Sequence, residues 1–280
     1  MFYLGGSMST TTAPAPAPVH SPLPRSLAGR TAVILGGSSG IGLAAAGLLA
    51  SVGARILLVG RDEGRLESAV ARVTAAGAHA DAAAAPAEVR GMPADVTDGE
   101  AMEEVFERAG SVHHVLMTAA YLSGLGPVTE LTRDAAQAGV AAPVQAVLGV
   151  VRAAVPRMAA GGSITLSSGV LVPRPQPGMA VPISAAGAIE TLARALAVEL
   201  APARLRVNAV RYGAIDTPLL RGRFGAAGAD VDAVIAEAGA AMPLGRFGTA
   251  EEAASAALFL MANPYMSGEV LTMDGGQSLV

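Results

Sequence analysis

The sequence predicts an α/β fold in which a single domain is built on a doubly wound parallel sheet. From Arg30 onward, short apolar runs alternate with longer Ala-rich helical stretches, a pattern typical of βαβ units. The apolar runs are continuous rather than alternating, as in strands that helices cover on both faces. The chain has 280 residues, 52% of them hydrophobic and 15% charged, which is enough to bury a full core.

Runs of aliphatic and β-branched residues predict the strands. In chain order they are Thr31–Leu35, Arg55–Val59, Val89–Ala94, Val112–Thr118, Ser163–Ser168, Arg206–Val210 and Val270–Met273. Ala-rich or amphipathic stretches predict the helices between them. These are Ile41–Val52, Glu63–Ala76, Asp134–Met158, Ser184–Leu200 and Glu251–Met261. We expect the long helix from Asp134 to be interrupted near Pro143, because proline removes a backbone donor.

The chain divides into a tail and a domain. Residues 1–26 are predicted to be a disordered tail, because the stretch from Thr10 to Pro24 mixes Ala and Pro with Ser and Thr and has little apolar surface to bury. The tail lacks the basic segment and apolar run of a secretory signal. Residues 27–280 form the predicted domain.

The composition excludes several kinds of chemistry. The chain has no Cys and no Lys, since Arg accounts for all 19 basic residues. Thiolate nucleophiles, Cys-ligated metals, Schiff bases and a Walker-A lysine are therefore excluded, and we expect no metal site. The net charge of −4 argues against a nucleic-acid surface or a polybasic membrane anchor. We expect a cytoplasmic protein with a small-molecule partner and no membrane segment.

A glycine-rich turn follows the first strand. It comprises Gly36, Gly37, Ser38, Ser39, Gly40, Ile41 and Gly42. Small residues between a strand and a helix let the backbone approach a pyrophosphate, whose charge is stabilised at the helix N-terminus. The alternative is an ordinary glycine turn. The position at the start of an α/β domain favours dinucleotide binding in a Rossmann-like fold.

The end of the second strand bears on the choice of dinucleotide. An acid at this point binds the ribose 2′-hydroxyl of NAD, whereas an Arg suits the 2′-phosphate of NADP. Arg61 occupies the tip, so NADP(H) is favoured, and Asp62 keeps NAD(H) possible. We interpret Asp62 mainly as the N-cap of the following helix.

From about Leu27 to Val280 the chain resembles the short-chain dehydrogenase/reductase family. Gly36, Gly40 and Gly42 match its glycine signature, and Asp95-Val96 resembles the pair that contacts adenine. Further matches are Arg206–Val210 with the sixth strand, Thr217 with the threonine at the nicotinamide carboxamide, and Pro243–Arg246 and Asp274–Gly276 with C-terminal signatures. The resemblance implies a substrate lid at about 217–242 and a homodimer or homotetramer.

The family's catalytic residues do not carry over. The family uses Asn, Ser, Tyr and Lys, and the strand-five serine is present as Ser168. Aligning the next helix on Leu192–Arg194 and Glu199 places the Tyr position at Pro182 and the Lys position at Ala186. A shift of one residue gives Val181 and Ala185 instead. The position of the catalytic helix Asn falls at Pro143, and the family's separate Asn-Asn-Ala-Gly motif after strand four becomes Thr118-Ala119-Ala120-Tyr121.

Two tyrosines are candidates to replace the missing acid. Tyr121 and Tyr212 both follow strands at their carboxyl ends, where ligands bind in open α/β sheets. Each is alternatively a wall that packs on the cofactor or substrate. The candidate catalytic residues are thus Ser168, Tyr212 and Tyr121. The candidate cofactor contacts are Gly36, Ser38, Ser39, Gly40, Ile41, Gly42, Arg61, Asp95, Val96 and Thr217.

Three functions follow from this mixture of retained and missing features. The first is an atypical NADP(H)-dependent oxidoreductase that takes its proton from Ser168, a tyrosine or water; Leu, Phe and Ala in the lid favour an apolar substrate. The second is a non-redox cyclase, isomerase or dehydratase, since positioning alone lowers a barrier. The third is a non-catalytic binding subunit on the same scaffold.

Overall fold

The computed structural model describes residues 25–77, 87–119, 123–225 and 230–280. A seven-stranded parallel sheet forms its centre, in the order β3-β2-β1-β4-β5-β6-β7. Its strands are β1 (Thr31–Leu35), β2 (Arg55–Gly60), β3 (Glu88–Pro93), β4 (Val112–Met117), β5 (Met158–Gly169), β6 (Arg206–Tyr212) and β7 (Val270–Met273). The predicted fold class is confirmed.

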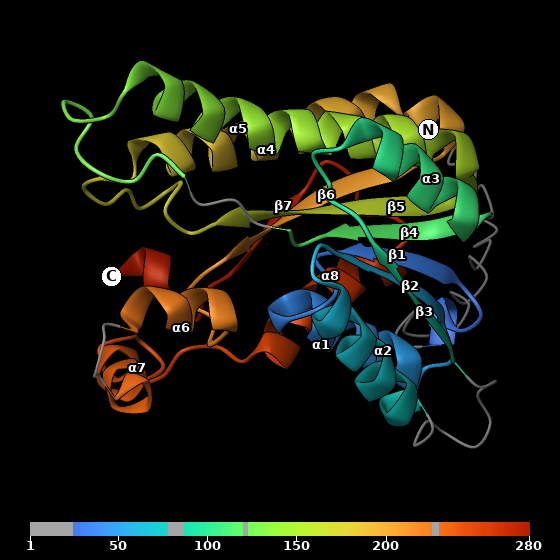
Figure 1. Cartoon of the computed structure of the whole chain (residues 1–280), viewed down its shortest axis with the longest axis horizontal. Coiled ribbons are helices and arrows are strands. Elements are labelled where there is room, and N and C mark those ends of the chain that lie inside the picture. The colour runs from blue at the N-terminus through green and yellow to red at the C-terminus, as the bar shows by residue number, and fades with distance from the viewer. Residues whose placement is uncertain (1–24, 78–86, 120–122, 226–229) are drawn as a thin grey trace, which may run out of the picture.

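Helices cover the sheet on both faces, as Figure 1 shows. One face carries α3 (Gly99–Ala109), α4 (Arg133–Ala154) and α5 (Ala180–Glu199), and the other carries α1 (Gly40–Ser51), α2 (Glu63–Gly77) and α8 (Ala250–Ala262). Two shorter helices, α6 (Pro218–Phe224) and α7 (Val231–Ala240), follow the carboxyl end of β6 within the predicted lid. Short 3-10 turns lie at Arg25–Leu27, Val155–Arg157, Ala201–Ala203 and Gln277–Leu279.

Each face of the sheet has its own apolar core. Phe106 and Met102 of α3 are fully buried in the same core as residues of α4 and α5, whereas Leu49 of α1 and Leu260 of α8 fill the opposite face. Helix α3 was not among the predicted helices, although its signals are visible. Asp98 caps it by accepting hydrogen bonds from the backbone N–H groups of Glu100 and Ala101, and its apolar residues recur on one face.

Three boundaries on the α4/α5 face differ from the predictions. Helix α4 runs through Pro143 without a break, because the proline is buried and packing offsets its missing hydrogen bond. The helix ends at Ala154 rather than Met158, since Pro156 follows and β5 already starts at Met158. Helix α5 begins at Ala180 and accommodates Pro182 in its first turn, where no intrahelical N–H is required.

Two segments on this face have the length and composition of membrane-spanning helices. They are Arg133–Arg157 and Ala180–Glu199. Core helices of soluble proteins also meet these criteria, and both segments pack against the sheet and contribute residues to its core.

The strand order reverses direction between β1 and β4. The chain proceeds outward from β1 to β3 and then returns to β4 on the other side of β1. Such a switch point opens a crevice at the carboxyl ends of the strands, where α/β proteins bind their ligands. The glycine turn after β1 and the segment after β4 lie at this point.

Candidate active site

The glycine turn between β1 and α1 is folded tightly onto the segment after β4. Gly36 has a φ of +90° and Gly40 a φ of +52°, values that favour glycine. A Cβ at Gly36 would lie 2.6 Å from the backbone nitrogen of Ala119, and one at Gly42 would clash with the Gly36 carbonyl oxygen. Side chains are therefore excluded at Gly36 by the backbone of Ala119 and at Gly42 by the backbone of the turn itself.

Thr118 fixes the turn from the neighbouring strand. Its hydroxyl lies 3.2 Å from the Leu35 carbonyl oxygen and 3.3 Å from that of Gly36, and its backbone N–H donates to Leu35 at 2.8 Å. Thr118 occupies a position where the family resemblance places an Asn. The threonine hydroxyl holds the start of the glycine turn against the end of β4.

The start of α1 is left open for an anion. Ser39 is the N-cap, but its side chain makes no capping hydrogen bond. The first N–H groups of a helix carry partial positive charge and lack intrahelical acceptors. Thr217 lies beside this helix start, because a Cβ at Gly40 would be 3.4 Å from the Thr217 side chain. The turn, the open helix start and Thr217 together fit a dinucleotide.

The end of β2 presents Arg61 and Asp62 in different roles. Arg61 is exposed. Asp62 caps α2 through Oδ1, which accepts from the Arg65 backbone N–H at 2.8 Å, and its Oδ2 lies 3.1 Å from Arg65 Nε. The backbone and side-chain hydrogen bonds from Arg65 hold the pKa of Asp62 below its usual range. The N-cap interpretation of Asp62 is confirmed.

Two further candidate cofactor contacts flank this edge. Asp95 follows β3, and its Oδ1 accepts from the Thr97 backbone N–H at 2.9 Å and from the Thr97 hydroxyl at 2.8 Å. Val96 is buried in the core on the α3 face. The Asp95–Thr97 hydrogen bonds and the burial of Val96 do not test a contact with adenine. Both residues therefore remain predicted adenine contacts.

Ser168 lies at the carboxyl end of β5 and contacts a residue that the sequence analysis missed. Its hydroxyl donates to Glu190 Oε1 of α5 at 2.7 Å. The Ala186 carbonyl oxygen is 3.4 Å away from the same hydroxyl. Glu190 follows Ala186 by one helical turn, so its side chain lies on the same face of α5. The side chain of Glu190 is only 5% exposed.

Arg211 of β6 neutralises this buried carboxylate. Its Nε donates to Glu190 Oε1 at 2.8 Å, its Nη2 donates to Oε2 at 2.6 Å, and its Nη1 donates to the Thr272 hydroxyl at 3.0 Å. Burial pushes the pKa of Glu190 upward, but the hydrogen bonds from Arg211 and Ser168 outweigh it and leave the pKa below its usual range. Glu190 is therefore ionised at neutral pH.

Tyr212 points away from this cluster. Its side chain packs in the core on the α1/α8 face, because neighbouring residues of a strand point to opposite faces. Its hydroxyl is buried and has no hydrogen-bond partner among the described residues, and burial raises its pKa. A raised pKa makes a phenol a poorer acid at neutral pH. Tyr121 lies outside the described residues.

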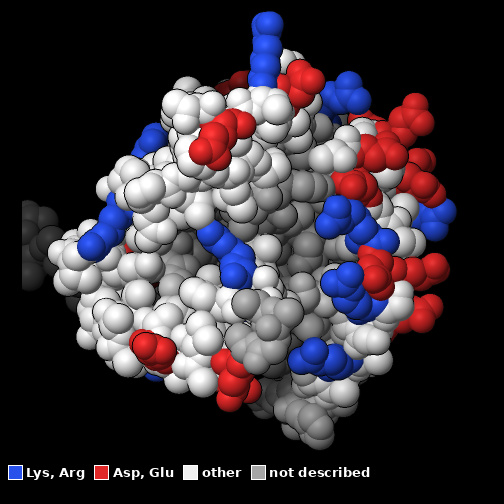
Figure 2. Space-filling view, turned by 60° about the vertical axis from the view of Figure 1, so that its left-hand side comes forward, with Lys and Arg blue, Asp and Glu red and all other residues white. Residues whose placement is uncertain are grey.

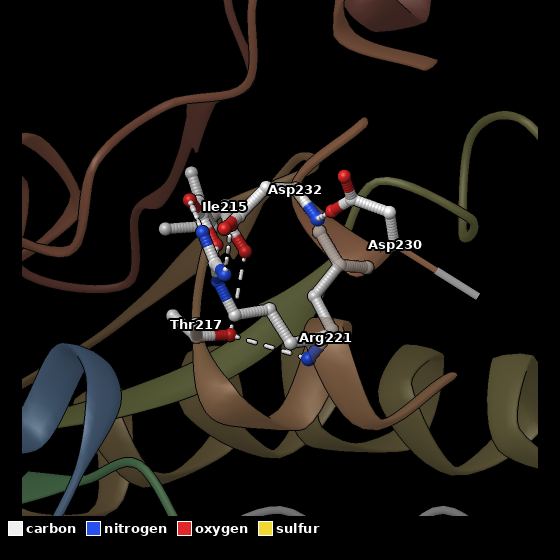
Figure 3. Close-up of polar contacts among 7 residues, drawn as sticks. Ile215, Thr217, Arg221, Asp230 and Asp232 are labelled. Atoms are coloured by element: carbon white, nitrogen blue, oxygen red, sulfur yellow. Dashed lines mark hydrogen bonds and ion pairs between the residues drawn. The ribbon is translucent and has the colours of Figure 1, made fainter. Parts of the chain in front are cut away.

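Arg221 ties together α6 and α7, the two helices of the predicted lid (Figure 3). Its Nε and Nη2 donate to the two carboxylate oxygens of Asp216 at 2.6 and 2.8 Å, and its Nη1 donates to Asp232 Oδ1 at 2.6 Å. Thr217 caps α6 and its hydroxyl contacts the Ile215 carbonyl at 3.3 Å, while Asp230 caps α7. Asp216, which accepts the hydrogen bonds from Arg221, directly precedes Thr217 in the chain.

A hollow of about 90 Å³ lies between the end of β6, the predicted lid and the C-terminal segment. Its lining combines apolar Ile215, Met242, Leu244 and Met273 with polar Gln277 and the charged residues Arg246, Glu252 and Asp274. Figure 2 shows the side of the molecule that carries α6 and α7. Charged side chains gather along one side of this view, and most of the remaining surface is uncharged.

Comparison with known proteins gives matches over nearly the whole domain. A family model described as enoyl-(acyl carrier protein) reductase matches residues 36–278. The short-chain dehydrogenase/reductase ATR9 of Stachybotrys chlorohalonatus is 31% identical over 257 residues, covering 90% of this chain and 98% of its own. Carbonyl reductase family member 4 of Danio rerio is 32% identical over 257 residues, covering 90% and 99%.

Solved structures give the same picture. The MalC reductase/Diels-Alderase of Malbranchea aurantiaca superposes with a TM-score of 0.81 at 29% identity, covering 93% of this chain and 100% of its own. An NADPH-bound short-chain oxidoreductase of Pseudomonas aeruginosa, described as containing an atypical catalytic centre, has a TM-score of 0.77 at 29% identity, covering 88% and 96%.

Proposed function

Because the chain belongs to the short-chain dehydrogenase/reductase family, we propose that it is an oxidoreductase that uses NADP(H) on an apolar small molecule without a Tyr–Lys pair. The glycine turn, in which the surrounding backbone excludes a side chain at Gly36 and at Gly42, carries the proposal. It lies at the same end of the sheet as Ser168. A nucleotide held there brings its reactive ring toward the lid and the Ser168 cluster.

The preference for NADP(H) is supported by the end of β2. Asp62 is engaged by α2 through Arg65, and this contact competes with a hydrogen bond to a ribose. Arg61 is the residue whose charge suits a 2′-phosphate. The Pseudomonas relative, described as having an atypical catalytic centre, has been solved with NADPH. An altered site and NADPH binding therefore coexist in one member of the family.

Each part of the nucleotide has a proposed contact. The glycine turn and the N-terminus of α1 hold the pyrophosphate, Asp95 and Val96 contact the adenine, and Thr217 contacts the nicotinamide carboxamide. When bound, the nicotinamide supplies hydride-transfer chemistry. Ser168 is the polar group that meets the substrate, and the lid encloses the substrate on its apolar side.

Proton handling must differ from that of the family. A general acid contributes roughly 10²–10⁴-fold to a rate, and the chain contains no Lys to lower the pKa of a tyrosine. The aligned positions Pro182 and Ala186 both lie in α5, and neither side chain transfers a proton. The proposed enzyme therefore depends on Ser168, on the residues that hold it and on water.

Calorimetric titration with NADPH and NADH tests the proposal. We expect NADPH to bind more tightly, and Arg61→Ala to weaken NADPH binding about 10- to 100-fold while leaving NADH binding unchanged, as for loss of a charge-assisted hydrogen bond. Arg72→Ala, on the exposed face of α2, is the matched control. Failure of the protein to bind either nucleotide would reject the proposal, and equal NADPH affinity in Arg61→Ala would reject the role of Arg61.

A non-redox reaction is the second candidate. The Malbranchea relative is described as both a reductase and a Diels-Alderase, so one protein with this fold joins hydride transfer to a cyclisation. The hollow beside the predicted lid, which has both apolar and charged residues in its lining, offers a surface for positioning a reactive substrate. Product formation without consumption of reduced nucleotide would favour this candidate, whereas stoichiometric consumption would favour the oxidoreductase.

We also propose that the chain forms a homodimer or homotetramer through the outer faces of α4 and α5. Leu148 of α4 is 46% exposed and Val198 of α5 is 78% exposed. A second copy packed on these helices would remove both side chains from water. Sedimentation analysis of wild type and Val198→Glu tests this, since a monomeric wild-type protein would contradict it.

A further inference from the structure

The hydroxyl of Ser168 is oriented by the protein around it. Its contacts among the described residues are two acceptors, Glu190 Oε1 at 2.7 Å and the Ala186 carbonyl oxygen at 3.4 Å. A serine hydroxyl has one proton to donate and two lone pairs with which to accept. The single proton is therefore directed into the protein, toward a carboxylate that is ionised at neutral pH.

From this geometry we propose that Glu190 is a positioning residue that makes Ser168 a hydrogen-bond acceptor, so that the site binds its substrate through a hydroxyl group rather than a carbonyl oxygen. This rests on the proposed function and names the substrate class of the same site. Ser168 is half-buried and lies at the carboxyl end of β5, the edge of the sheet at which α/β proteins bind ligands. Its lone pairs are free to accept a hydrogen bond from that ligand.

Arg211 makes this arrangement stable. The guanidinium donates to both oxygens of Glu190, which fixes the carboxylate in one orientation. The strands place the partners in line, since Ser168 pairs with Arg211 across β5 and β6, and Arg211 pairs with Thr272 across β6 and β7. The same ion pair compensates the negative charge that would otherwise stand beside Ser168.

A carbonyl ligand meets a different situation. To accept a hydrogen bond from Ser168, the carbonyl oxygen must replace Glu190 Oε1 as the acceptor of the serine proton. Glu190 is charged and is therefore the stronger acceptor. The carbonyl oxygen would also face the lone pairs of the serine. A ligand hydroxyl donates to Ser168 without disturbing the contact with Glu190. Of two ligands that differ only in this group, the alcohol is therefore the better ligand.

Paired probes test this polarity through binding rather than turnover. We use 1-indanol with 1-indanone and 1-tetralol with 1-tetralone, which are apolar and differ only at the oxygen-bearing carbon. Their affinities are measured by saturation-transfer NMR with the full-length protein, with and without NADP⁺. Nucleotide affinity is measured separately by calorimetry, so a failure of nucleotide binding is distinguished from a failure of the inferred polarity.

We expect each alcohol to bind wild type about tenfold more tightly than its ketone, which corresponds to about 1.4 kcal/mol. Ser168→Ala keeps the Glu190–Arg211 ion pair and should make the two affinities equal. Glu190→Gln frees the serine hydroxyl from its charged acceptor and should reduce the preference at least threefold. Glu199→Gln is the matched control, because Glu199 is an exposed carboxylate on the same helix.

Several outcomes would overturn the inference. It is wrong if the ketone binds wild type as tightly as the alcohol, if the preference survives in Ser168→Ala, or if neither pair binds at millimolar concentration. A purely structural role for Glu190 predicts lower stability in Glu190→Gln with an unchanged alcohol preference. That result would also overturn the inference, and thermal unfolding of the same samples separates the two effects.

Discussion

Replacing Arg211 with Met removes the cation that holds Glu190. The ion pair is largely buried, with side-chain exposures of 18% for Arg211 and 5% for Glu190. In Arg211→Met the carboxylate keeps Ser168 as a donor but loses two charge-assisted hydrogen bonds. Breaking a buried pair from one side costs about 3–5 kcal/mol. Because the guanidinium is partly exposed, we expect the lower end, about 3 kcal/mol.

The reciprocal variant should be milder. Glu190→Gln leaves an arginine that water reaches and that still donates to Thr272, so we expect a cost of about 1–2 kcal/mol. The double variant with Met at both positions should recover most of the loss, because it leaves no buried charge unpaired. This order of stabilities separates an ion pair from simple packing.

The effect should depend on pH with a defined sign. In wild type the pKa of Glu190 lies below its ordinary value of 4.5, so the stabilisation is present above that value and is lost as the pH falls through the lower, folded-state pKa. In Arg211→Met, burial dominates and raises the pKa, so the penalty is full at neutral pH and disappears on protonation. Both effects reduce the difference in the free energy of unfolding between wild type and Arg211→Met as the pH falls toward about 4.

Urea unfolding followed by circular dichroism measures these differences, since the chain contains no Trp to serve as a fluorescence probe. Protein concentration is held constant because self-association shifts apparent stability. The reasoning is refuted if Arg211→Met loses less than about 1 kcal/mol, the worth of an ordinary exposed pair. A loss that is independent of pH would refute it as well.

Three further predictions concern the turn, a helix cap and the lid. Gly42→Ala should abolish nucleotide binding in calorimetry and lower the melting temperature, because its Cβ meets the Gly36 carbonyl oxygen; unchanged binding would contradict the tight turn. Asp98→Ala should destabilise the protein by about 0.5–2 kcal/mol, measured by urea unfolding, because α3 loses its N-cap. An unchanged free energy of unfolding would show that the Asp98 cap does not stabilise the protein. Arg221→Gln should raise hydrogen exchange in α6 and α7 several-fold. Arg223→Gln should not, because among the described residues the Arg223 side chain contacts only the Met179 sulfur. Equal exchange in both variants would show that the contacts of Arg221 with Asp216 and Asp232 do not hold the two helices together.

Features that depend on neighbouring residues in the chain could be predicted. The strands were found from their apolar runs, and the N-cap role of Asp62 was predicted from its place before a helix and is confirmed. The boundary errors arose at prolines. Pro156 ends α4 and Pro182 is accepted in the first turn of α5, and the sequence does not state which of these two effects a proline will have.

The Ser168 cluster could be predicted only in part. Ser168 was identified through the family resemblance, but Glu190 and Arg211 were not assigned to the site. Their contact needs α5 to lie over β5 and β6 at one specific rotation, which is a tertiary property. Glu190 shares α5 with the charged residues Arg194 and Glu199, and only the folded structure shows that Glu190 is the one that is buried and therefore requires a partner.

The contact between Arg211 and Thr272 gives the edge of the sheet a part in the site. Strand β7 is only four residues long and pairs with β6 alone, so it is the strand most easily detached from the sheet. Fraying of β7 would withdraw the Thr272 hydroxyl, release one side of the guanidinium and let the carboxylate beside Ser168 change its orientation. The reactivity of the centre is in this way linked to the integrity of the last strand in the chain.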